Sequence, residues 1–304
     1  MRVVAVIVAY NRAALLQDCL TAVREQTRAL DEVLVVDNAS SDDSADVAMN
    51  HPLRPHVLSL TRNTGGAGGF AVGVDLAVRR YGADWVWLMD DDTIPSPTAL
   101  TELLWACGNY DGRVDIAGSA VVWSDGQAHP MNTPRQRWRV SSVDLGKAAA
   151  VACLPVRTSS FVSLLVNADA VRRVGLPKAG YFIWNDDFEY SARVLRHGVG
   201  LAVPASVVEH RTKTPAAADA DPGPRFYFEV RNKIWTLLKT YDFDPLDWAA
   251  YSFSTLRRWA RTWQNSTDRP QLLKTGLRGL RDGLFTSPKP TSEVITEAMP
   301  RHRP

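Results

Sequence analysis

Residues 85–95 read Trp-Val-Trp-Leu-Met-Asp-Asp-Asp-Thr-Ile-Pro, an apolar run that ends in three carboxylates. The run is typical of a buried β-strand, whose alternation directs Asp90 and Asp92 to one side and Asp91 to the other. Adjacent carboxylates repel one another unless a cation or hydrogen bonds offset their charge. The spacing therefore predicts two oxygen ligands for one Mg²⁺ or Mn²⁺, an ion that usually also binds substrate phosphates. The alternative is an acidic turn that caps the helix beginning near Pro97.

Strand and helix patterns alternate along the first ninety residues. Buried strands are expected at residues 3–9, 33–36, 56–60 and 85–89. Helices are expected between them, the first over about 12–26 and another ending near residue 80. This alternation predicts right-handed βαβ units and an open, mainly parallel α/β sheet. Ligands of such sheets gather beyond the carboxyl ends of the strands, which selects residues 10–11, 37–38, 62–69 and 90–92 as one crevice.

The pattern changes after the strand expected at 116–122. Residues 123–147 favour a long loop or ragged hairpin, another strand is expected at 159–166, and short strands at 199–203 and 207–208. A Pro- and Ala-rich linker is expected at 214–224, and helices at 226–241, 245–264 and 270–284. We therefore expect a catalytic domain over 1–215, a helical region over 225–286 and a disordered tail over 287–304.

The composition is that of a globular chain: 304 residues, 45% hydrophobic and 22% charged. Residues 225–304 hold 14 Lys and Arg against 8 Asp and Glu, a basic excess too sparse for nucleic acid and suited to an anionic membrane surface or an acidic partner. The isolated Cys19, Cys107 and Cys153 argue against disulfides or zinc and favour a reducing compartment. Since no eighteen-residue apolar run exists, we expect a cytoplasmic protein, peripheral on the inner face of the membrane.

A glycine-rich segment follows the third expected strand. Residues 62–70 read Arg-Asn-Thr-Gly-Gly-Ala-Gly-Gly-Phe, whereas a dinucleotide fingerprint belongs after the first strand, where residues 9–12 read Ala-Tyr-Asn-Arg. Glycines before a helix allow close backbone approach, and the amide donors there favour an anion or a polar ring. The alternative is a tight turn without function.

A second acidic group, Asp186, Asp187 and Glu189, opens a helix expected to run to about residue 197. Glu189 follows too closely for all three carboxylates to share one helix face. One can act as a general base toward a hydroxyl while another orients loops. The alternative is a cap formed by Asn185 or Asp186. His210 follows an apolar strand; a lone histidine is commonly structural, but beside a D-x-D pair it suits Mn²⁺, which accepts nitrogen and oxygen ligands.

Five segments resemble, in order and spacing, the inverting glycosyltransferases of family 2, which have the GT-A fold. They are residues 6–12, 35–40, 63–69, 87–92 and 185–189, and the resemblance covers roughly residues 1–235. It implies Asp187 as the catalytic base and Asp90, Asp92 and His210 as ligands of Mn²⁺ or Mg²⁺. It assigns donor binding to Ala9, Asn11, Asp37, Asn63, Gly66 and Asp91, with Asp37 at the base of the nucleotide. It assigns acceptor binding or support to Trp184, Asp186 and Glu189.

Residues 65–70, 85–87 and 225–232 further resemble galactofuranosyltransferases that begin actinobacterial cell-wall galactan on a lipid-linked acceptor. The implied partners are a nucleotide-sugar donor and a polyprenyl-diphosphate-linked glycan. The resemblance at residues 63–70 and 225–232 chiefly implies UDP-galactofuranose as donor, with dTDP-rhamnose as the alternative. The glycines also leave room for a furanose, and Phe70 can wall off one side. Asn185 departs from relatives that carry Trp or Gly there, which leaves acceptor specificity open.

Three other functions are consistent with parts of the pattern. A D-x-D phosphatase wants Thr where this chain has Ile94, and a sugar nucleotidyltransferase wants a Gly-rich arginine loop directly after the first strand. A carbohydrate-binding or scaffold protein on the same fold is disfavoured because both acidic groups are intact.

The C-terminal helices carry an apolar stripe. Its residues are Leu273, Leu277, Leu280 and Leu284, flanked by Lys274, Arg278 and Arg281. This pattern favours docking on a membrane surface or on another subunit of a homo-oligomer. The alternative is packing on the catalytic domain, since apolar stripes most often face a core.

Overall fold

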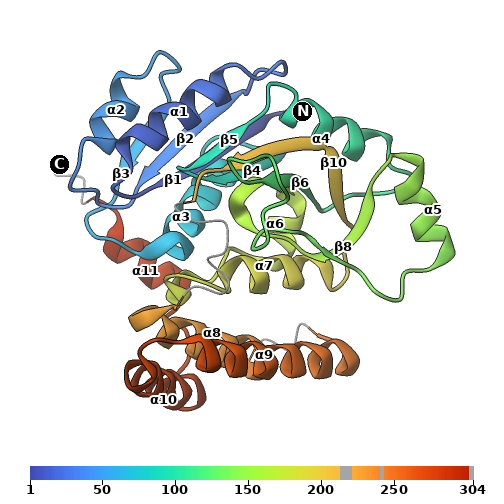
Figure 1. Ribbon diagram of the computed structural model, residues 1–304. Helices are drawn as coiled ribbons and strands as arrows, with labels where there is room; N and C mark the ends of the chain where they lie inside the picture. The colour runs from blue at the N-terminus through green and yellow to red at the C-terminus, as the bar shows by residue number, and fades with distance from the viewer. Residues whose placement is uncertain (213–220, 240–242, 301–304) are drawn as a thin grey trace.

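The computed structural model describes residues 1–212, 221–239 and 243–300. Its centre is one mixed sheet in the strand order β3-β2-β1-β4-β9-β6-β10-β8-β7, with β5 paired to β10 (Figure 1). The first four strands are parallel and have the bounds β1 (Val3–Ala9), β2 (Glu32–Asp37), β3 (His56–Ser59) and β4 (Trp85–Asp90). β1 is buried along its whole length, as expected for a strand covered by helices on both faces.

The second half of the sheet is reached through an antiparallel strand. β9 (Leu164–Asn167) lies between β4 and β6 (Ile116–Val122) and is antiparallel to both. β10 (Gly200–His210) then runs parallel to β6, so the two short strands expected at 199–208 are one strand with a register shift. The remaining strands are β5 (Thr93–Pro95), β7 (Arg135–Gln136) and β8 (Leu154–Thr158). The α/β fold with a mostly parallel central sheet is thus confirmed.

Helices cover both faces of the sheet (Figure 1). One core joins the sheet to α1 (Ala13–Arg24), α2 (Ser44–Asn50), α4 (Ala99–Asn109) and α5 (Ser142–Ala150). The other joins it to α3 (Gly65–Arg79), α6 (Ala168–Val174), α7 (Asp186–Leu195) and α11 (Thr291–Ala298). Both cores are built from the aliphatic side chains that alternate along the strands.

A separate helical layer lies beneath α7 (Figure 1). It consists of α8 (Phe226–Lys239), α9 (Pro245–Asn265) and α10 (Arg269–Phe285), which begin and end within two residues of the expected bounds. Its small core joins Phe226, Val230, Ile234 and Leu272. No helix within the described ranges is long and apolar enough to cross a membrane.

The expectation of a disordered tail is wrong for residues 291–298. These residues form α11, which buries Val294 and Ala298 against the α3 side of the sheet. The Thr61 amide donates to the Ala298 carbonyl at 2.9 Å, so the helix end is fixed by the backbone as well. Short apolar side chains one helical turn apart suffice for this packing, although they are too few to stand out in the sequence.

Two further segments were expected to lack regular structure, residues 123–147 and residues 214–224. Residues 123–147, expected as a loop, contain β7 and the start of α5, whose N-cap Ser141 accepts a hydrogen bond from the Asp144 amide. Most of the linker expected at 214–224 lies outside the described residues, as does the very end of the tail.

Close packing of α3 on β1 yields a first testable prediction. A Cβ added at Gly73 would lie 2.2 Å from Val6 Cγ1, whose side chain is fully buried. We expect Gly73→Ala to lower the free energy of unfolding by about 1–3 kcal/mol, since overpacking outweighs the gain in helix propensity. The control is Gly146→Ala in α5, where a Cβ meets nothing within 4 Å and about 0.5–1 kcal/mol of stabilisation is expected. Urea denaturation of both variants measures these free energies of unfolding. Equal changes in the two variants would contradict the close packing of α3 on β1.

Candidate active site

The acidic triplet lies where β4 ends beside β1. The Asp91 carboxylate turns toward β1 and accepts a hydrogen bond from the Tyr10 amide at 2.9 Å. Burial raises the pKa of Asp91 to about 7, and this amide and the Arg12 guanidinium oppose the rise. Arg12 contacts both Asp91 and Asp92. Asp91 therefore ties two strand ends together. It does not face away from Asp92 as the alternation predicts, because β4 ends at Asp90 and one Arg12 nitrogen contacts both later carboxylates.

Asp90, Asp92 and His210 come together as the sequence predicts. One ligand atom from each lies within 4.8 Å of the others. β10 delivers the histidine because its last residue pairs with Thr93, directly after the triplet. Asn132 Oδ1 lies 2.9 Å from His210 Nδ1, which leaves Nε2 facing Asp92 Oδ1 at 3.1 Å.

The donor set of this cluster fits a divalent cation. Burial and the neighbouring Asp92 raise the pKa of Asp90 to about 6. Although burial opposes it, the pKa of Asp92 is lowered by His210 and Arg12. Asp92 Oδ1 is buried, and among the described residues its polar neighbour is His210 Nε2 at 3.1 Å, so the oxygen keeps a lone pair for a shared cation. Two carboxylates and one imidazole oriented by an amide suit Mn²⁺, and Mg²⁺ with more water in its shell.

The carboxyl ends of β1 and β2 form the next part of the crevice. Ala9 pairs with Asp37 across the two strands, and Asp37 is buried with Oδ1 accepting from the Ser40 amide at 3.1 Å. Asn11 has a positive φ of 52°, and its Oδ1 accepts from the Ser41 amide at 2.7 Å. These residues lie at the carboxyl ends of the strands, where a nucleotide is expected. Their polar side chains hold the loops that follow β1 and β2 in shape.

The glycine segment forms the first turns of α3 itself. Gly65 has a φ of 70°, and a Cβ there would lie 1.8 Å from the Phe182 carbonyl oxygen, so only glycine fits. Asn63 Oδ1 accepts from the Gly65 amide at 2.7 Å, and a Cβ at Gly66 would meet nothing within 4 Å. Asn38 joins this turn to β2, since its side chain donates to the Gly65 carbonyl at 2.8 Å. The turn thus combines a close backbone contact at one glycine with open space at the next.

The second acidic group follows a strained loop. Phe182, Trp184 and Asn185 all have positive φ, with values of 68°, 66° and 64°. Asn232 of α8 is fully buried, and its amide nitrogen lies 2.9 Å from each of three loop carbonyls, those of Tyr181, Ile183 and Trp184. Non-glycine residues hold such conformations only where their surroundings impose them, commonly at functional sites.

The three carboxylates after this loop point in different directions, as their spacing predicts. Glu189 is 1% exposed and forms ion pairs with Lys178 at 2.8 Å and Arg193 at 2.9 Å, so it supports the fold. Asp186 is buried, and burial together with Asp187 raises its pKa well above the usual range. The structure gives Asn185 no capping bond; its side chain donates to Glu229 Oε2 at 2.9 Å.

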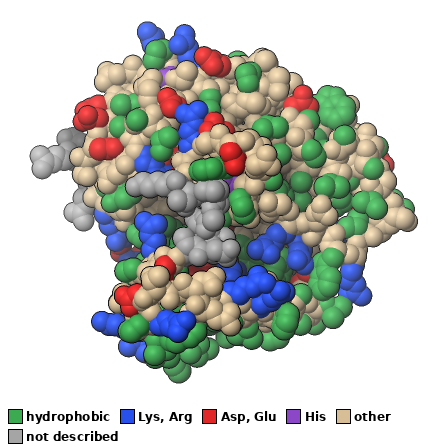
Figure 2. All heavy atoms as spheres, in the orientation of Figure 1, with side chains coloured by type: hydrophobic (Ala, Val, Ile, Leu, Met, Phe, Trp, Pro, Cys, Tyr) green, Lys and Arg blue, Asp and Glu red, His purple; other side chains and the backbone are tan. Residues whose placement is uncertain are grey.

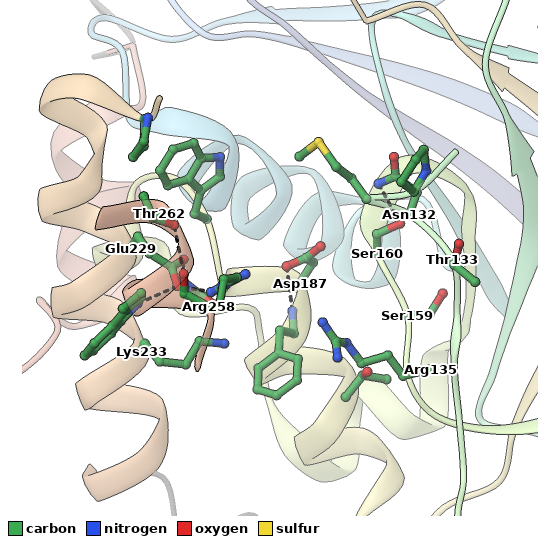
Figure 3. Close-up of a pocket in the computed structure, with 18 of the residues that line it drawn as sticks. Asn132, Thr133, Arg135, Ser159, Ser160, Asp187, Glu229, Lys233, Arg258 and Thr262 are labelled. Atoms are coloured by element: carbon green, nitrogen blue, oxygen red, sulfur yellow. Dashed lines mark hydrogen bonds and ion pairs between the residues drawn. The ribbon is translucent and has the colours of Figure 1, made fainter. Parts of the chain in front are cut away.

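Asp187 faces a cavity of about 300 Å³ between α7 and the C-terminal helical layer. Figure 3 shows its carboxylate in the middle of this space, with Lys233 and Arg258 on one side and Arg135 on the other. Burial raises the pKa of Asp187, and the Phe188 amide, Lys233 and Arg135 oppose the rise. Trp184 and Asn132 also line the cavity, and Asn132 connects it to His210.

Several residues of this site were not predicted from the sequence. Asn132, Asn232 and the cations Arg135, Lys233 and Arg258 reach it from segments read as a loop or as packing helices. Asn232 and Lys233 stand between Val230 and Ile234 on α8, and the structure shows that both are over nine-tenths buried, which a charged residue rarely is.

Residues 4–142 match the family model described as glycosyl transferase family 2. The chain is 33% identical to galactofuranosyltransferase GlfT1 of Mycolicibacterium smegmatis over 65% of its own length, and spans just under two thirds of that relative, 66%. It is 31% identical to galactofuranosyltransferase GlfT1 of Mycobacterium tuberculosis over 77% of this chain and 82% of that relative.

Solved structures share the fold at lower identity. Staphylococcus aureus TarS 1–349 in complex with UDP-GlcNAc superposes with a TM-score of 0.65 at 14% identity, over 98% of this chain and 84% of that one. A Pyrobaculum calidifontis mannosyltransferase in complex with GDP-Man and Mn²⁺ superposes with a TM-score of 0.55 at 18% identity, over 97% and 78% of the two chains. These likenesses establish the GT-A arrangement of the sheet and helices.

Proposed function

This chain belongs to glycosyltransferase family 2, and on that premise we propose that it moves a sugar, with inversion, from a nucleoside diphosphate to a hydroxyl of a lipid-linked glycan. The observation that carries the proposal is a pair of sites joined by one residue. Asn132 contacts His210, which belongs to the cluster of metal-ligand side chains with Asp90 and Asp92. Asn132 also lines the cavity that holds Asp187. A leaving group and an attacking hydroxyl need such neighbouring sites.

Asp90, Asp92 and His210 would hold the metal, Mn²⁺ or Mg²⁺. Bound there, the ion neutralises charge that develops on the departing diphosphate. The convergence of the three side chains within 4.8 Å of one another and the Asn132 contact to His210 support this role. The Mn²⁺ recorded with the Pyrobaculum mannosyltransferase is consistent with it.

Asp187 would act as the general base. Its carboxylate takes the proton of the acceptor hydroxyl while that oxygen forms a bond to the anomeric carbon, and the bond to the diphosphate breaks on the opposite face. Lys233 and Arg135 favour the ionised form of the carboxylate despite its burial. Asp186 and Trp184 support the acceptor side of the loop, and Glu189 fixes the helix that carries the base.

The nucleotide would lie along the crevice formed by β1, β2 and α3. Asp37 would bind its base, and Asn63 and Gly66 the sugar-phosphate end, with Ala9, Asn11 and Asp91 shaping the walls. The open space at Gly66 supports a donor there. The UDP-GlcNAc held by TarS, on the same fold, is consistent with a nucleotide-sugar in this crevice.

We propose UDP-galactofuranose as the donor, and the two galactofuranosyltransferase relatives support this choice over dTDP-rhamnose. The acceptor would be a polyprenyl-diphosphate-linked glycan of a cell-wall polysaccharide, presented at the inner face of the cell membrane. A lipid-linked acceptor requires the enzyme to work close to a bilayer, and the C-terminal helices offer a surface for this.

The donor assignment is tested by competition. With both nucleotide-sugars present and Mn²⁺ added, we expect a higher kcat/KM for UDP-galactofuranose than for dTDP-rhamnose, measured as release of each nucleoside diphosphate. EDTA should abolish release from both, because the donor diphosphate needs the cation. Preference for dTDP-rhamnose would overturn the donor while leaving the family intact; full turnover in EDTA would overturn the metal site.

Substitution of the base gives a second test. We expect Asp187→Asn to lower kcat by about 10²–10⁴-fold with little change in donor KM, the usual contribution of a positioned base. Because burial raises the pKa of Asp187, wild-type activity should also fall as the pH drops through that raised value. Asp46→Asn, an exposed carboxylate on α2, is the matched control and should keep full activity. Wild-type turnover in the Asp187 variant would exclude this role.

Membrane docking of the C-terminal layer forms a third prediction. Leu273, Leu277, Leu280 and Leu284 are exposed by 41–56%, so this stripe does not pack on the catalytic domain. Figure 2 shows apolar side chains along the lower edge of the molecule, where the C-terminal helices lie, with basic side chains beside them. Apolar residues flanked by cations suit an anionic bilayer surface.

We expect the protein to float with anionic liposomes at low salt, and less with neutral ones. The triple variant Leu273→Gln, Leu277→Gln, Leu280→Gln should lose flotation. Leu145→Gln, which changes an exposed leucine on α5, should retain it. Absence of wild-type flotation together with a stable oligomer in solution would assign the stripe to a subunit interface instead.

A further inference from the structure

We propose that Arg135, Lys233 and Arg258 form an anion subsite that holds a phosphate group of the acceptor beside Asp187. This inference rests on the proposed function and specifies what its acceptor must carry. The three cations come from β7, α8 and α9, and all three side chains line this cavity. Figure 3 shows them on opposite sides of Asp187.

The burial of Lys233 is the strongest evidence for an anion subsite. Its side chain is 6% exposed, and its ammonium lies 4.0 Å from the centre of the Phe188 ring. Among the described residues it makes no hydrogen bond or ion pair. Burial and the nearby Arg135 lower the pKa of Lys233 to about 7, and Asp187 opposes the shift. A buried ammonium without a paired anion is costly, and a bound phosphate would relieve that cost.

Arg258 is held in place from behind. Its guanidinium contacts Glu229, which also accepts a hydrogen bond from Trp259 Nε1 at 3.2 Å and from the Asn185 side chain at 2.9 Å. Glu229 thereby ties α8 and α9 to the loop before the base and fixes the arginine at the cavity wall. Burial lowers the pKa of Arg258 to about 10, and Arg135 contributes to the shift.

The charges around the cavity do not balance. Three cations face two carboxylates, Asp187 and Glu229, and Glu229 is already engaged by Arg258. Arg135 is exposed, and its side chain has no polar partner among the described residues. Guanidinium groups bind phosphate oxygens in pairs and lysine adds a point charge, so this set suits a phosphate or diphosphate.

The position of the cations favours the acceptor over the donor as the source of that phosphate. None of Asp90, Asp92 and His210 lines the cavity, whereas the donor diphosphate belongs with them. The cavity extends from Asn132, beside His210, to the cations on α8 and α9. An acceptor hydroxyl at Asp187 would thus leave its phosphate on the side of the C-terminal helices.

A binding measurement without turnover tests the subsite directly. Inorganic diphosphate is titrated into the full chain in EDTA, which removes any contribution of the cation cluster, and tryptophan fluorescence or calorimetry gives Kd. We expect Lys233→Met and Arg135→Gln each to raise Kd about tenfold or more, since charge-assisted hydrogen bonds to the anion are lost. Arg79→Gln, an exposed arginine on α3, should leave Kd unchanged. Equal Kd in all four proteins would overturn the subsite.

Kinetics then identify the source of the phosphate. The same glycan is offered on a lipid diphosphate and on a neutral alkyl chain. We expect Lys233→Met to raise KM about tenfold or more for the first acceptor and much less for the second. A larger rise in donor KM would assign the cations to the donor, and equal rises for both acceptors would reduce Lys233 to a packing role; either result overturns the proposal.

The two experiments separate this inference from the proposed function. Diphosphate binding that depends on Lys233, with no sugar transfer to either acceptor, would support the anion subsite and contradict the glycan acceptor. Normal sugar transfer without diphosphate binding that depends on Lys233 would support the glycan acceptor and contradict the anion subsite. Folding is not at issue for Lys233→Met, because replacing a buried charge by an apolar chain of similar length is often neutral or stabilising.

Discussion

Mutual repulsion of three consecutive carboxylates is the constraint around which this molecule is built. Asp90, Asp91 and Asp92 end the central strand β4 in a space too dry for three uncompensated negative charges. Three groups offset this charge: the backbone amide of Tyr10 just past β1, the Arg12 guanidinium and the His210 imidazole at the end of β10. Strands that are remote in sequence must therefore end at the same edge of the sheet. The same negative field suits the divalent cation that we propose for this site.

The second half of the site depends on a different kind of restraint. The loop before Asp187 holds positive φ at Phe182 and Trp184, which bulky side chains do not favour, and at Asn185. The Asn232 amide, buried on α8, bonds three of its carbonyls and so imposes the shape. The helical layer thus fixes the loop that positions the Asp187 carboxylate, and the sheet domain alone would not hold that loop in this shape. Glu229 adds a side-chain link between the same two regions.

The sequence was informative where chemistry and periodicity agree. The β-branched run of β1, the D-x-D spacing and the stripe on α10 each follow from local patterns, and they place the sheet, the cation cluster and an exposed apolar rim. The sequence did not predict features that depend on packing between distant segments. The antiparallel insertion of β9, the burial of Lys233 and the bond from Asn132 to His210 depend on contacts between segments tens of residues apart. α11 was missed because its few apolar residues gain stability only from the surface of α3 that receives them.

That last helix has a mechanical consequence. The layer of α8–α10 is joined to the sheet domain at its start, through Asn232, and again at its end, where α11 returns to the far side of α3. A segment tethered at both ends behaves as a strap and cannot swing open like a door on one hinge. The cavity between α7 and this layer is therefore bounded by an element fixed to the sheet domain at both ends, and its width is set by the fold before anything enters it.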